Sequence, residues 1–219
     1  MRNCIRLIVY LVVTIGISSA IAGSYDDFFV AIKRDDADTV RALLQRGFDP
    51  NTPSLEHLDG LYVALRDGSL KVAQVLADWP KANVDTRTDH DETPLMMACL
   101  RGQADIARKL IARGADVNKA GWTPLHYAAT SGNVTIIRML LDENAYIDAD
   151  SPNGSTPLMM AAMYGTPESV KLLLDSGADP TLKNQLGLTA LDFAKRADRK
   201  DAAELVTAGL RAWQAKRAR

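Results

Sequence analysis

The residue types that most often bind metals are sparse in this chain. There are three histidines, His57, His90 and His126. A zinc site needs Cys or His ligands in pairs at short spacing, and the sequence holds no such pair. The densest group of possible ligands is the run Asp-His-Asp-Glu at 89–92. Four consecutive residues in a turn seldom converge on one ion, so we expect no metal.

Nucleophilic and cofactor chemistry is not expected either. Cys99 stands among small and apolar residues, where a thiol is a core side chain and not a reactive thiolate. No Gly-rich loop follows a strand-like segment, and no serine occupies a nucleophile elbow. The methionine pairs at 96–97 and 159–160 are interpreted as gap-filling core residues. We therefore predict no catalytic residue and no cofactor.

The near-equal numbers of basic and acidic residues exclude recruitment of a charged partner by a long-range electrostatic field. The 219 residues include 26 basic and 27 acidic ones, and 47% are hydrophobic, as in an ordinary folded protein. Such a balance does not attract nucleic acid or an anionic membrane surface. Only the end of the chain after Glu204 is locally basic, which we interpret as a solvated tail on a last helix.

The first 22 residues differ from the rest. Arg2 and Arg6 precede an uncharged apolar run over 7–23, which ends in the small residues around Ala22. This pattern is typical of a secretory signal peptide, and we expect cleavage after Ala22. A retained inner-membrane anchor is the alternative, because the run is close to the shortest that can cross a bilayer. The mature chain would keep only Cys99, so no internal disulfide is expected.

A short motif recurs along the mature chain at spacings of 30, 33 and 33 residues. In each copy Thr can cap a helix, the next position holds Pro in three copies, and a small residue follows at a fixed distance. Three copies then reach a Gly that can end a short helix. One such helix pair has apolar residues on both sides, so the copies must stack. The four copies begin at Thr93, Thr123, Thr156 and Thr189.

This pattern, with Gly-Ala-Asp at the exit of a repeat as in 114–116, resembles the ankyrin repeat. The resemblance covers essentially the whole mature chain. It implies an all-α ankyrin-repeat solenoid of about six helix-turn-helix units with β-hairpin-like finger turns. We expect the signal peptide at 1–22, the repeat domain at 23–207 and a basic C-terminal tail or helix at 208–219. The units lie near 26–51, 52–85, 86–118, 119–148, 149–181 and 182–207.

Several repeats depart from the pattern. The turn that enters the fourth repeat is three residues shorter than that of the fifth, which leaves a notch beside Trp122. Pro80 stands where Gly is usual and predicts a local bend. His57 and Asp91 replace a turn glycine, and the histidine is the more strained of the two. His126 matches the family's structural histidine, which ties the turn to the helix.

The resemblance implies that the finger tips and the inner face of the first helices form a concave surface that binds proteins. From the fourth repeat onward the matching positions are unusually apolar for water-facing residues. An exposed apolar cluster with aromatics and a polar rim is typical of a contact centre. The alternative is that some of these side chains are half-buried against their neighbours. The expected contact residues are Trp122, Tyr164, Met163, Leu100, Arg101, Asp89, His90, Glu92, Asn153, Ser155, Leu186 and Leu188.

We expect a non-catalytic protein–protein interaction module that acts in the periplasm and binds a protein partner on the concave surface. The alternatives are an immunity or inhibitor protein against a toxin delivered into the periplasm, and a membrane-tethered scaffold supporting a stress-defence enzyme. The chain is expected to be periplasmic or secreted after cleavage, or else anchored in the inner membrane facing the periplasm. No nucleic-acid partner is expected. Contact with a membrane is expected only if the N-terminal segment is retained.

Overall fold

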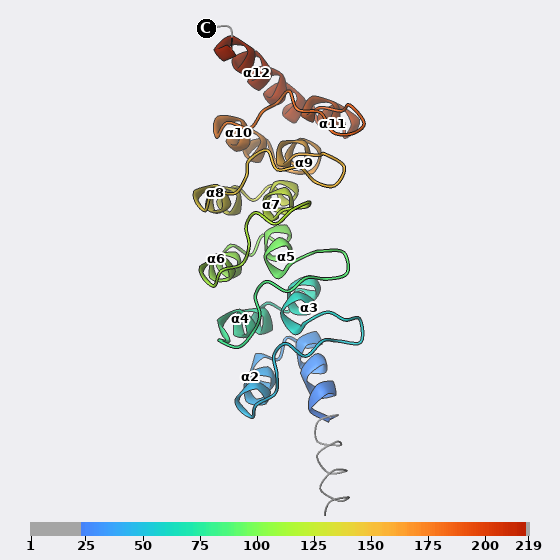
Figure 1. Cartoon of the computed structure of the whole chain (residues 1–219), viewed down its shortest axis with the longest axis vertical. Coiled ribbons are helices and arrows are strands. Elements are labelled where there is room, and N and C mark those ends of the chain that lie inside the picture. Colours follow the sequence, from blue (N-terminus) through green and yellow to red (C-terminus); the bar gives the residue numbers. More distant parts are fainter. Residues whose placement is uncertain (1–22, 218–219) are drawn as a thin grey trace, which may run out of the picture. The chain divides into compact units, whose positions relative to one another are not determined.

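The computed structural model describes residues 23–217, and every regular element within that range is a helix (Figure 1). The signal peptide expected at 1–22 lies outside the described residues. The all-α fold class predicted from the sequence is confirmed for the described part. The chain divides into two compact units, Met1–Asn83 and Val84–Arg219. The first unit holds the helical residues 23–33 and the helices α2 (Ala37–Gln45), α3 (Gly60–Asp67) and α4 (Leu70–Asp78).

The second unit is a stack of four helix pairs. Its first helices, α5, α7, α9 and α11, pack one against the next, and the second helices α6, α8, α10 and α12 do the same beside them (Figure 1). The bounds are α5 (Pro94–Leu100), α6 (Ala104–Ala112), α7 (Pro124–Ser131), α8 (Val134–Asp142), α9 (Pro157–Tyr164), α10 (Pro167–Asp175), α11 (Ala190–Arg196) and α12 (Lys200–Arg217).

The recurring threonines begin the first helices, as the motif predicts. The side chain of Thr123 accepts a hydrogen bond from the backbone N–H of His126, and Pro124 follows at the first helical position, where its missing N–H costs nothing. The equivalent Thr93, Thr156 and Thr189 make the same cap in their own repeats. The motif therefore sets where each finger turn ends and each inner helix begins.

The core lies along the first helices. All six residues from Pro94 to Cys99 in α5 are buried, so this helix has no side facing water along that run. The second helices bury one stripe only, such as Ile136, Ile137 and Leu140 in α8. Burying each of these side chains contributes about 2 kcal/mol. Stacking of neighbouring repeats is what makes that burial possible.

A ladder of hydrogen bonds links the turns of successive repeats. In four of the fingers an Asn or Asp at the base uses its side-chain Oδ1 to accept a hydrogen bond from a backbone N–H at the exit of the next repeat. The acceptor and donor pairs are Asn51 with Asn83 (2.7 Å) in the first unit, and Asp85 with Asp116 (3.2 Å), Asn118 with Tyr146 (2.8 Å) and Asp148 with Asp179 (3.0 Å) in the second.

The positions that depart from the repeat pattern adopt the backbone conformations that their residue types predict. His57 and Asp91 both adopt φ of 59° in their turns, the left-handed conformation that a glycine would take without strain. Near Pro80 the chain bends, since α4 stops at Asp78 and the amide of Ala82 closes a tight turn on the carbonyl of Trp79. The bend expected at this position is confirmed.

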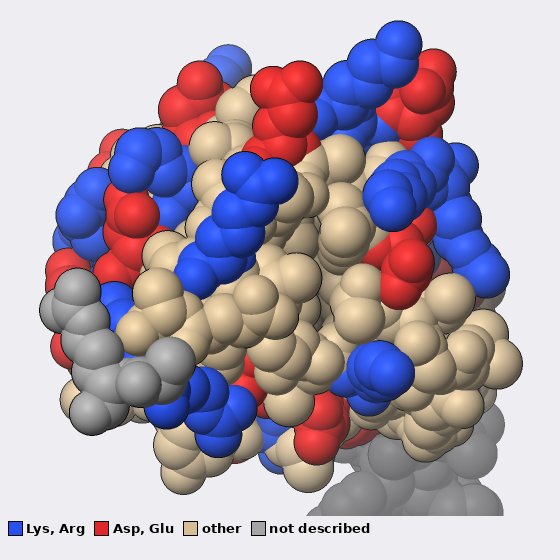
Figure 2. Space-filling view, turned by 90° about the horizontal axis from the view of Figure 1, so that it is seen from above, with Lys and Arg blue, Asp and Glu red and all other residues tan. Residues whose placement is uncertain are grey.

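The C-terminal helix α12 continues to Arg217 and packs against α10 and α11. Val206 is buried on that side, and Trp213 is half-buried with the guanidinium of Arg217 5.9 Å above its ring. Figure 2 looks onto this end of the chain, where Lys and Arg are interspersed with Asp and Glu. A charged end face is what a last repeat needs, because no further repeat covers it.

None of the described helices combines the length and the apolar character that a bilayer-spanning helix requires.

Two glycines with left-handed backbone test how tightly the repeats pack. A Cβ on Gly132 (φ +70°) would lie 2.7 Å from the backbone nitrogen of Thr166, whereas a Cβ on Gly177 (φ +100°) would meet nothing within 4 Å. We expect Gly177→Ala to lower the free energy of unfolding by about 1 kcal/mol through backbone strain alone. Gly132→Ala should cost about 1–3 kcal/mol more, because Thr166 must move. Denaturant unfolding measures both, and equal losses would contradict the close approach.

Candidate functional site

A pocket of about 250 Å³ opens between the first helices of the third, fourth and fifth repeats, within the second unit. Its walls come from the end of α5, the shortened turn before α7, the exposed face of α7 and one side chain of α9. We call it the Trp122 pocket. Its lining residues are Leu100, Trp122, His126, Tyr127, Thr130 and Met160.

The turn that carries Trp122 is closed differently from the others in its unit. In each longer finger a backbone hydrogen bond joins the two ends of the loop. These bonds run from Thr88 to Glu92, from Ser151 to Ser155 and from Asn184 to Leu188, each with an N···O distance of 3.0 Å. The fourth repeat is too short for that loop, and a lysine side chain takes over the closure.

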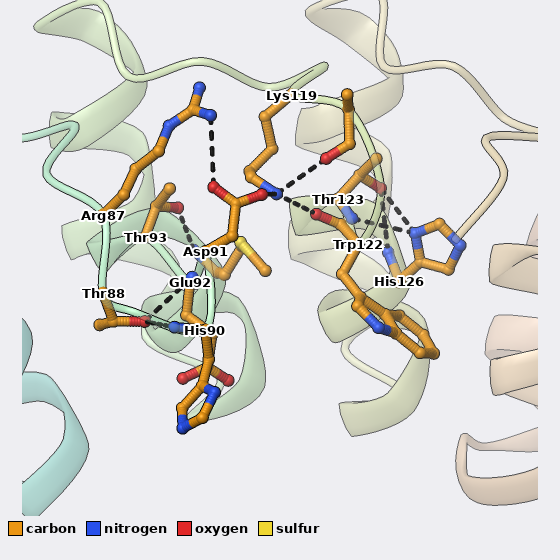
Figure 3. A network of polar contacts seen from close by, with 12 residues as sticks. Arg87, Thr88, His90, Asp91, Glu92, Thr93, Lys119, Trp122, Thr123 and His126 are labelled. Carbon is orange, nitrogen blue, oxygen red and sulfur yellow. Dashed lines mark hydrogen bonds and ion pairs between the residues drawn. The ribbon is translucent and has the colours of Figure 1, made fainter. Parts of the chain in front are cut away.

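Lys119 provides this closure from a buried position, with 3% of its surface exposed. Its Nζ donates to the carbonyl oxygens of Ala120 (2.8 Å) and Trp122 (3.1 Å) and forms an ion pair with Oδ2 of Asp91 at 2.5 Å (Figure 3). An ammonium has three N–H donors, so these three partners satisfy it. Burying a charge in this way is tolerated only when its partners are complete.

Asp91 belongs to the finger of the preceding repeat, so the ion pair joins two fingers. Its Oδ1 also accepts a hydrogen bond from Nη1 of Arg87 at 3.3 Å. The hydrogen bond from Lys119 is the main reason why the pKa of Asp91 lies below its usual value. The third and fourth finger turns are therefore held together by one carboxylate between two cations.

His126 fixes the other side of the Trp122 turn. Its Nδ1 accepts from the backbone N–H of Thr123 at 3.1 Å, so the ring proton sits on Nε2 and is donated to the carbonyl of Ser155 at 2.9 Å. The ring is fully buried, and burial lowers its pKa to about 4. The indole of Trp122 meets the imidazole edge to face, with ring centroids 5.2 Å apart. The structural role predicted for His126 is confirmed.

The pocket has an acidic edge. The hydroxyl of Tyr127 donates to Oε1 of Glu92 at 2.8 Å. In Figure 3 the side chains of His90, Glu92 and Trp122 point to the same side of the two turns, while Arg87 points away from it. Asp89, in the same finger as Glu92, is exposed. The carboxylate of Glu92 thus lies beside the wall of the pocket that Tyr127 forms.

The structure brings together some of the contact residues expected from the sequence. Leu100 and Trp122 share the pocket, and Glu92 lies at its edge through Tyr127. The half-buried ones are Leu100, Trp122, Glu92, Met163 and Leu188, and the exposed ones are Asp89, His90, Arg101, Asn153, Tyr164 (55% exposed) and Leu186 (78% exposed).

The prediction that Ser155 is a contact residue is wrong. The sequence pattern places it on the exposed surface, but only 1% of it is accessible. Its N–H donates to Oγ of Ser151 at 2.9 Å, and its carbonyl accepts from His126. The longer finger of the fifth repeat folds this residue inward against the fourth repeat, so its side chain does not lie on the binding face.

Sequence reasoning missed Tyr127 and Met160 as pocket residues, while it placed Thr130 on the concave face. The signal was present, because Tyr127 and Thr130 are three positions apart in α7 and so lie on one helical face. Their equivalents in α5 are Met97 and Leu100. An interpretation of the first helices mainly as core overlooks the part of their surface that remains open.

The first unit has a pocket of its own, of about 280 Å³. Its apolar walls include Tyr25, Phe29, Val30 and Leu55, and the last of these is 90% exposed. Its rim carries Arg66, which forms ion pairs with Glu56 (2.7 Å) and Asp67 (2.8 Å). The sequence pattern does not single out Leu55 or Val30.

Helix pairs that stack through capped first helices, with finger turns between them, define a helical repeat domain of the kind used for binding. A family model described as ankyrin repeats (3 copies) matches residues 28–120, 61–153, 117–184 and 143–212. The chain belongs to the ankyrin repeat family, whose domains are generally non-catalytic protein–protein interaction modules.

Individual relatives and one solved structure agree with this assignment. A putative ankyrin repeat-containing protein of Treponema pallidum is 34% identical over 161 residues, covering 70% of this chain and 51% of that one. Ankyrin repeat and SAM domain-containing protein 6 of Rattus norvegicus is 30% identical over 109 residues, covering 48% of this chain and 12% of that protein. The crystal structure of the human ASB11 ankyrin repeat domain superposes with a TM-score of 0.74 at 28% identity, covering 83% of this chain and 82% of that one.

This chain spans only a fraction, from 12% to about half, of the length of these two curated relatives.

The buried His126 predicts how stability depends on pH. Between about pH 6.5 and 4 the unfolded chain binds a proton on this imidazole that the folded chain does not, because burial lowers the pKa of the folded ring. The free energy of unfolding should therefore fall as the pH falls through this window. In His126→Gln we expect a smaller slope there, measured by denaturant unfolding at stepped pH.

Asp91→Asn is the matched control. Because the pKa of Asp91 is lowered in the folded state, its contribution is present above the pKa of the unfolded carboxyl and is lost as the pH falls further. This variant should change the slope of the curve below about pH 4 and leave the slope in the window above it unchanged, although the free energy of unfolding in that window is lower throughout. An unchanged slope between pH 6.5 and 4 in His126→Gln would contradict the assignment.

Proposed function

We propose that this chain binds a protein partner on the face of its second unit that carries the Trp122 pocket. The observation that carries the proposal is an apolar hollow, lined by two aromatic side chains and bordered by charge, on the open side of the stacked first helices. Such a combination is typical of the centre of a protein contact.

The apolar surface continues beyond the pocket. Met163 and Tyr164 end α9, which packs beside α7, and they occupy the positions that Thr130 and Ser131 hold in α7. Leu186, at the tip of the finger before α11, is largely exposed. Apolar side chains therefore extend from the pocket toward the later repeats, while the carboxylate of Glu92 lies beside it on the side of the earlier finger.

The titratable groups of the described residues support binding and not catalysis. No group of three or more His, Cys, Asp or Glu in this part of the chain is placed to hold a metal ion. Cys99 is fully buried, and burial raises the pKa of its thiol, which favours the unreactive form. His126 is a neutral structural group with both ring nitrogens engaged.

We place this activity in the periplasm. The support is the pattern of residues 1–22, with two arginines, an apolar run and small residues before Gly23. A partner would then be a periplasmic protein or one that enters that compartment.

Removing the aromatic groups should weaken partner binding without unfolding the repeat. We expect Trp122→Ala and Tyr164→Ala each to cost about 2 kcal/mol of affinity, roughly a 30-fold rise in Kd, because large aromatics dominate contact centres. The partner is first isolated by affinity purification from periplasmic extract, and binding is then measured by calorimetry.

Tyr146→Ala is the matched control, since that tyrosine is exposed but does not line the pocket. Melting temperatures of all three variants should stay close to that of the parent. If Trp122→Ala lowers the melting temperature strongly and leaves the affinity intact, the indole is a packing residue and the proposed site is wrong.

Export predicts a defined new N-terminus. When the full chain is expressed in a Gram-negative host, Edman sequencing of the periplasmic fraction should give a protein that begins at Gly23. Recovery of the uncleaved chain from the inner membrane would favour the anchored alternative. Recovery from the cytoplasm would overturn the periplasmic assignment.

A further inference from the structure

The turn that carries Trp122 is held in shape by one side chain. Within the described part of the chain, no backbone–backbone hydrogen bond begins or ends between Lys119 and Trp122. Instead, Nζ of Lys119 donates to the carbonyl oxygens of Ala120 at 2.8 Å and of Trp122 at 3.1 Å. The position of the Trp122 backbone therefore depends on the lysine side chain.

The lysine is held in turn by a residue of the neighbouring finger. Lys119 is 3% exposed, and its ammonium forms an ion pair with Oδ2 of Asp91. Figure 3 shows the ammonium between the carboxylate of Asp91 and the carbonyl of Trp122. Without that carboxylate a buried ammonium would keep an unsatisfied charge, which is strongly unfavourable. The ammonium would then move toward water and release the carbonyl oxygens of the turn.

The indole of Trp122 needs this support from its backbone. Its edge-to-face contact with the imidazole of His126, at 5.2 Å between ring centroids, restrains one side of the ring. Such a contact between aromatic rings is weaker than a hydrogen bond from a charged donor. The indole therefore keeps its place in the wall of the pocket only while the turn beneath it keeps its shape.

We propose that Lys119 is a positioning residue of the binding site, which places the Trp122 wall of the pocket, and that Asp91 keeps Lys119 in place. Neither residue lines the pocket. This rests on the proposed function and deepens it, because binding at Trp122 then depends on a carboxylate in the neighbouring finger. A wall that is already fixed binds more tightly, since no side chain has to be ordered when the partner arrives.

Fluorine NMR tests the positioning without any partner. The chain has three tryptophans, Trp79, Trp122 and Trp213. Labelling with 5-fluorotryptophan gives each a resonance, and Trp122→Phe assigns the one in the pocket. Lys119→Met removes the ammonium and keeps a long unbranched side chain. We expect the Trp122 resonance to shift or broaden in this variant and the other two resonances to stay unchanged.

Lys171→Met is the matched control. Lys171 is an exposed lysine of the same unit, and it forms an ion pair with Asp175 within α10. Its removal should leave all three resonances in place. An unchanged Trp122 resonance in Lys119→Met would overturn the proposal, because the indole would then be held by its contact with His126 alone.

Asp91→Asn tests whether the carboxylate acts through the lysine. Alone, it should shift the Trp122 resonance in the same direction as Lys119→Met. In the Lys119→Met background it should have no further effect, because the group through which it acts is gone. Additive shifts in the double variant would contradict this coupling. Circular dichroism shows whether each variant keeps its fold, and if Lys119→Met does not, Asp91→Asn carries the test.

A peptide probe gives the second readout. Random dodecapeptides displayed on phage are selected on the parent protein, and those that bind Trp122→Ala more weakly are kept. Lys119→Met should weaken the binding of such a peptide about tenfold, because the indole must be ordered on binding. Lys171→Met should leave the affinity unchanged, as measured by calorimetry.

The two proposals fail in different ways. If no selected peptide depends on Trp122, the proposed function loses its location and Lys119 has no binding site to position. If peptides depend on Trp122 but bind Lys119→Met as tightly as the parent, the proposed function stands and only the positioning role is wrong.

Discussion

Every feature of the second unit depends on the burial of its first helices between neighbours. In α7, which packs between α5 and α9, the side chains of Leu125, His126, Ala128 and Ala129 are fully buried, because a neighbouring helix covers each side. A single helix pair exposes too much apolar surface to fold alone, and small residues such as Ala128 and Ala129 let the next helix come close. The stack therefore fixes the spacing of the finger turns, and with it the shape of the surface they present.

The short turn of the fourth repeat shows how a local loss of hydrogen bonding is offset. Without room for the backbone bond that closes the other fingers of the unit, the chain uses the ammonium of Lys119. A buried lysine is costly to desolvate, but its three partners satisfy it, and one of them, Asp91, comes from the adjacent finger. The turn closed in this way places the indole of Trp122 against the imidazole of His126 in α7.

The local part of this architecture is predictable from the sequence. The threonine caps, the following prolines and the repeat spacing act within a few residues, so the positions of the helices follow directly from them. The structural role of His126 could likewise be predicted from its place in the motif. The threonine caps do not depend on how the neighbouring repeat is packed, whereas the bond from His126 to the carbonyl of Ser155 follows from the regular repeat spacing.

The site was less predictable because it depends on side-chain direction between repeats. Ser155 matches a surface position of the motif but is folded inward, and Tyr127 and Met160 line the pocket although their positions suggest core. The burial of Lys119 runs against the usual exposure of lysine. Only the closure of the shortened turn, with Asp91 nearby, makes that burial favourable.

The ladder at the base of the fingers has a consequence for how such a chain can change its length. Each rung joins a side-chain oxygen of either Asn or Asp to a main-chain amide, so the donor does not depend on residue type. A duplication or loss of DNA that encodes one whole repeat would bring a new acceptor against an old amide and restore the rung. Insertions of partial repeats would not, which favours evolution of this chain in steps of one complete unit.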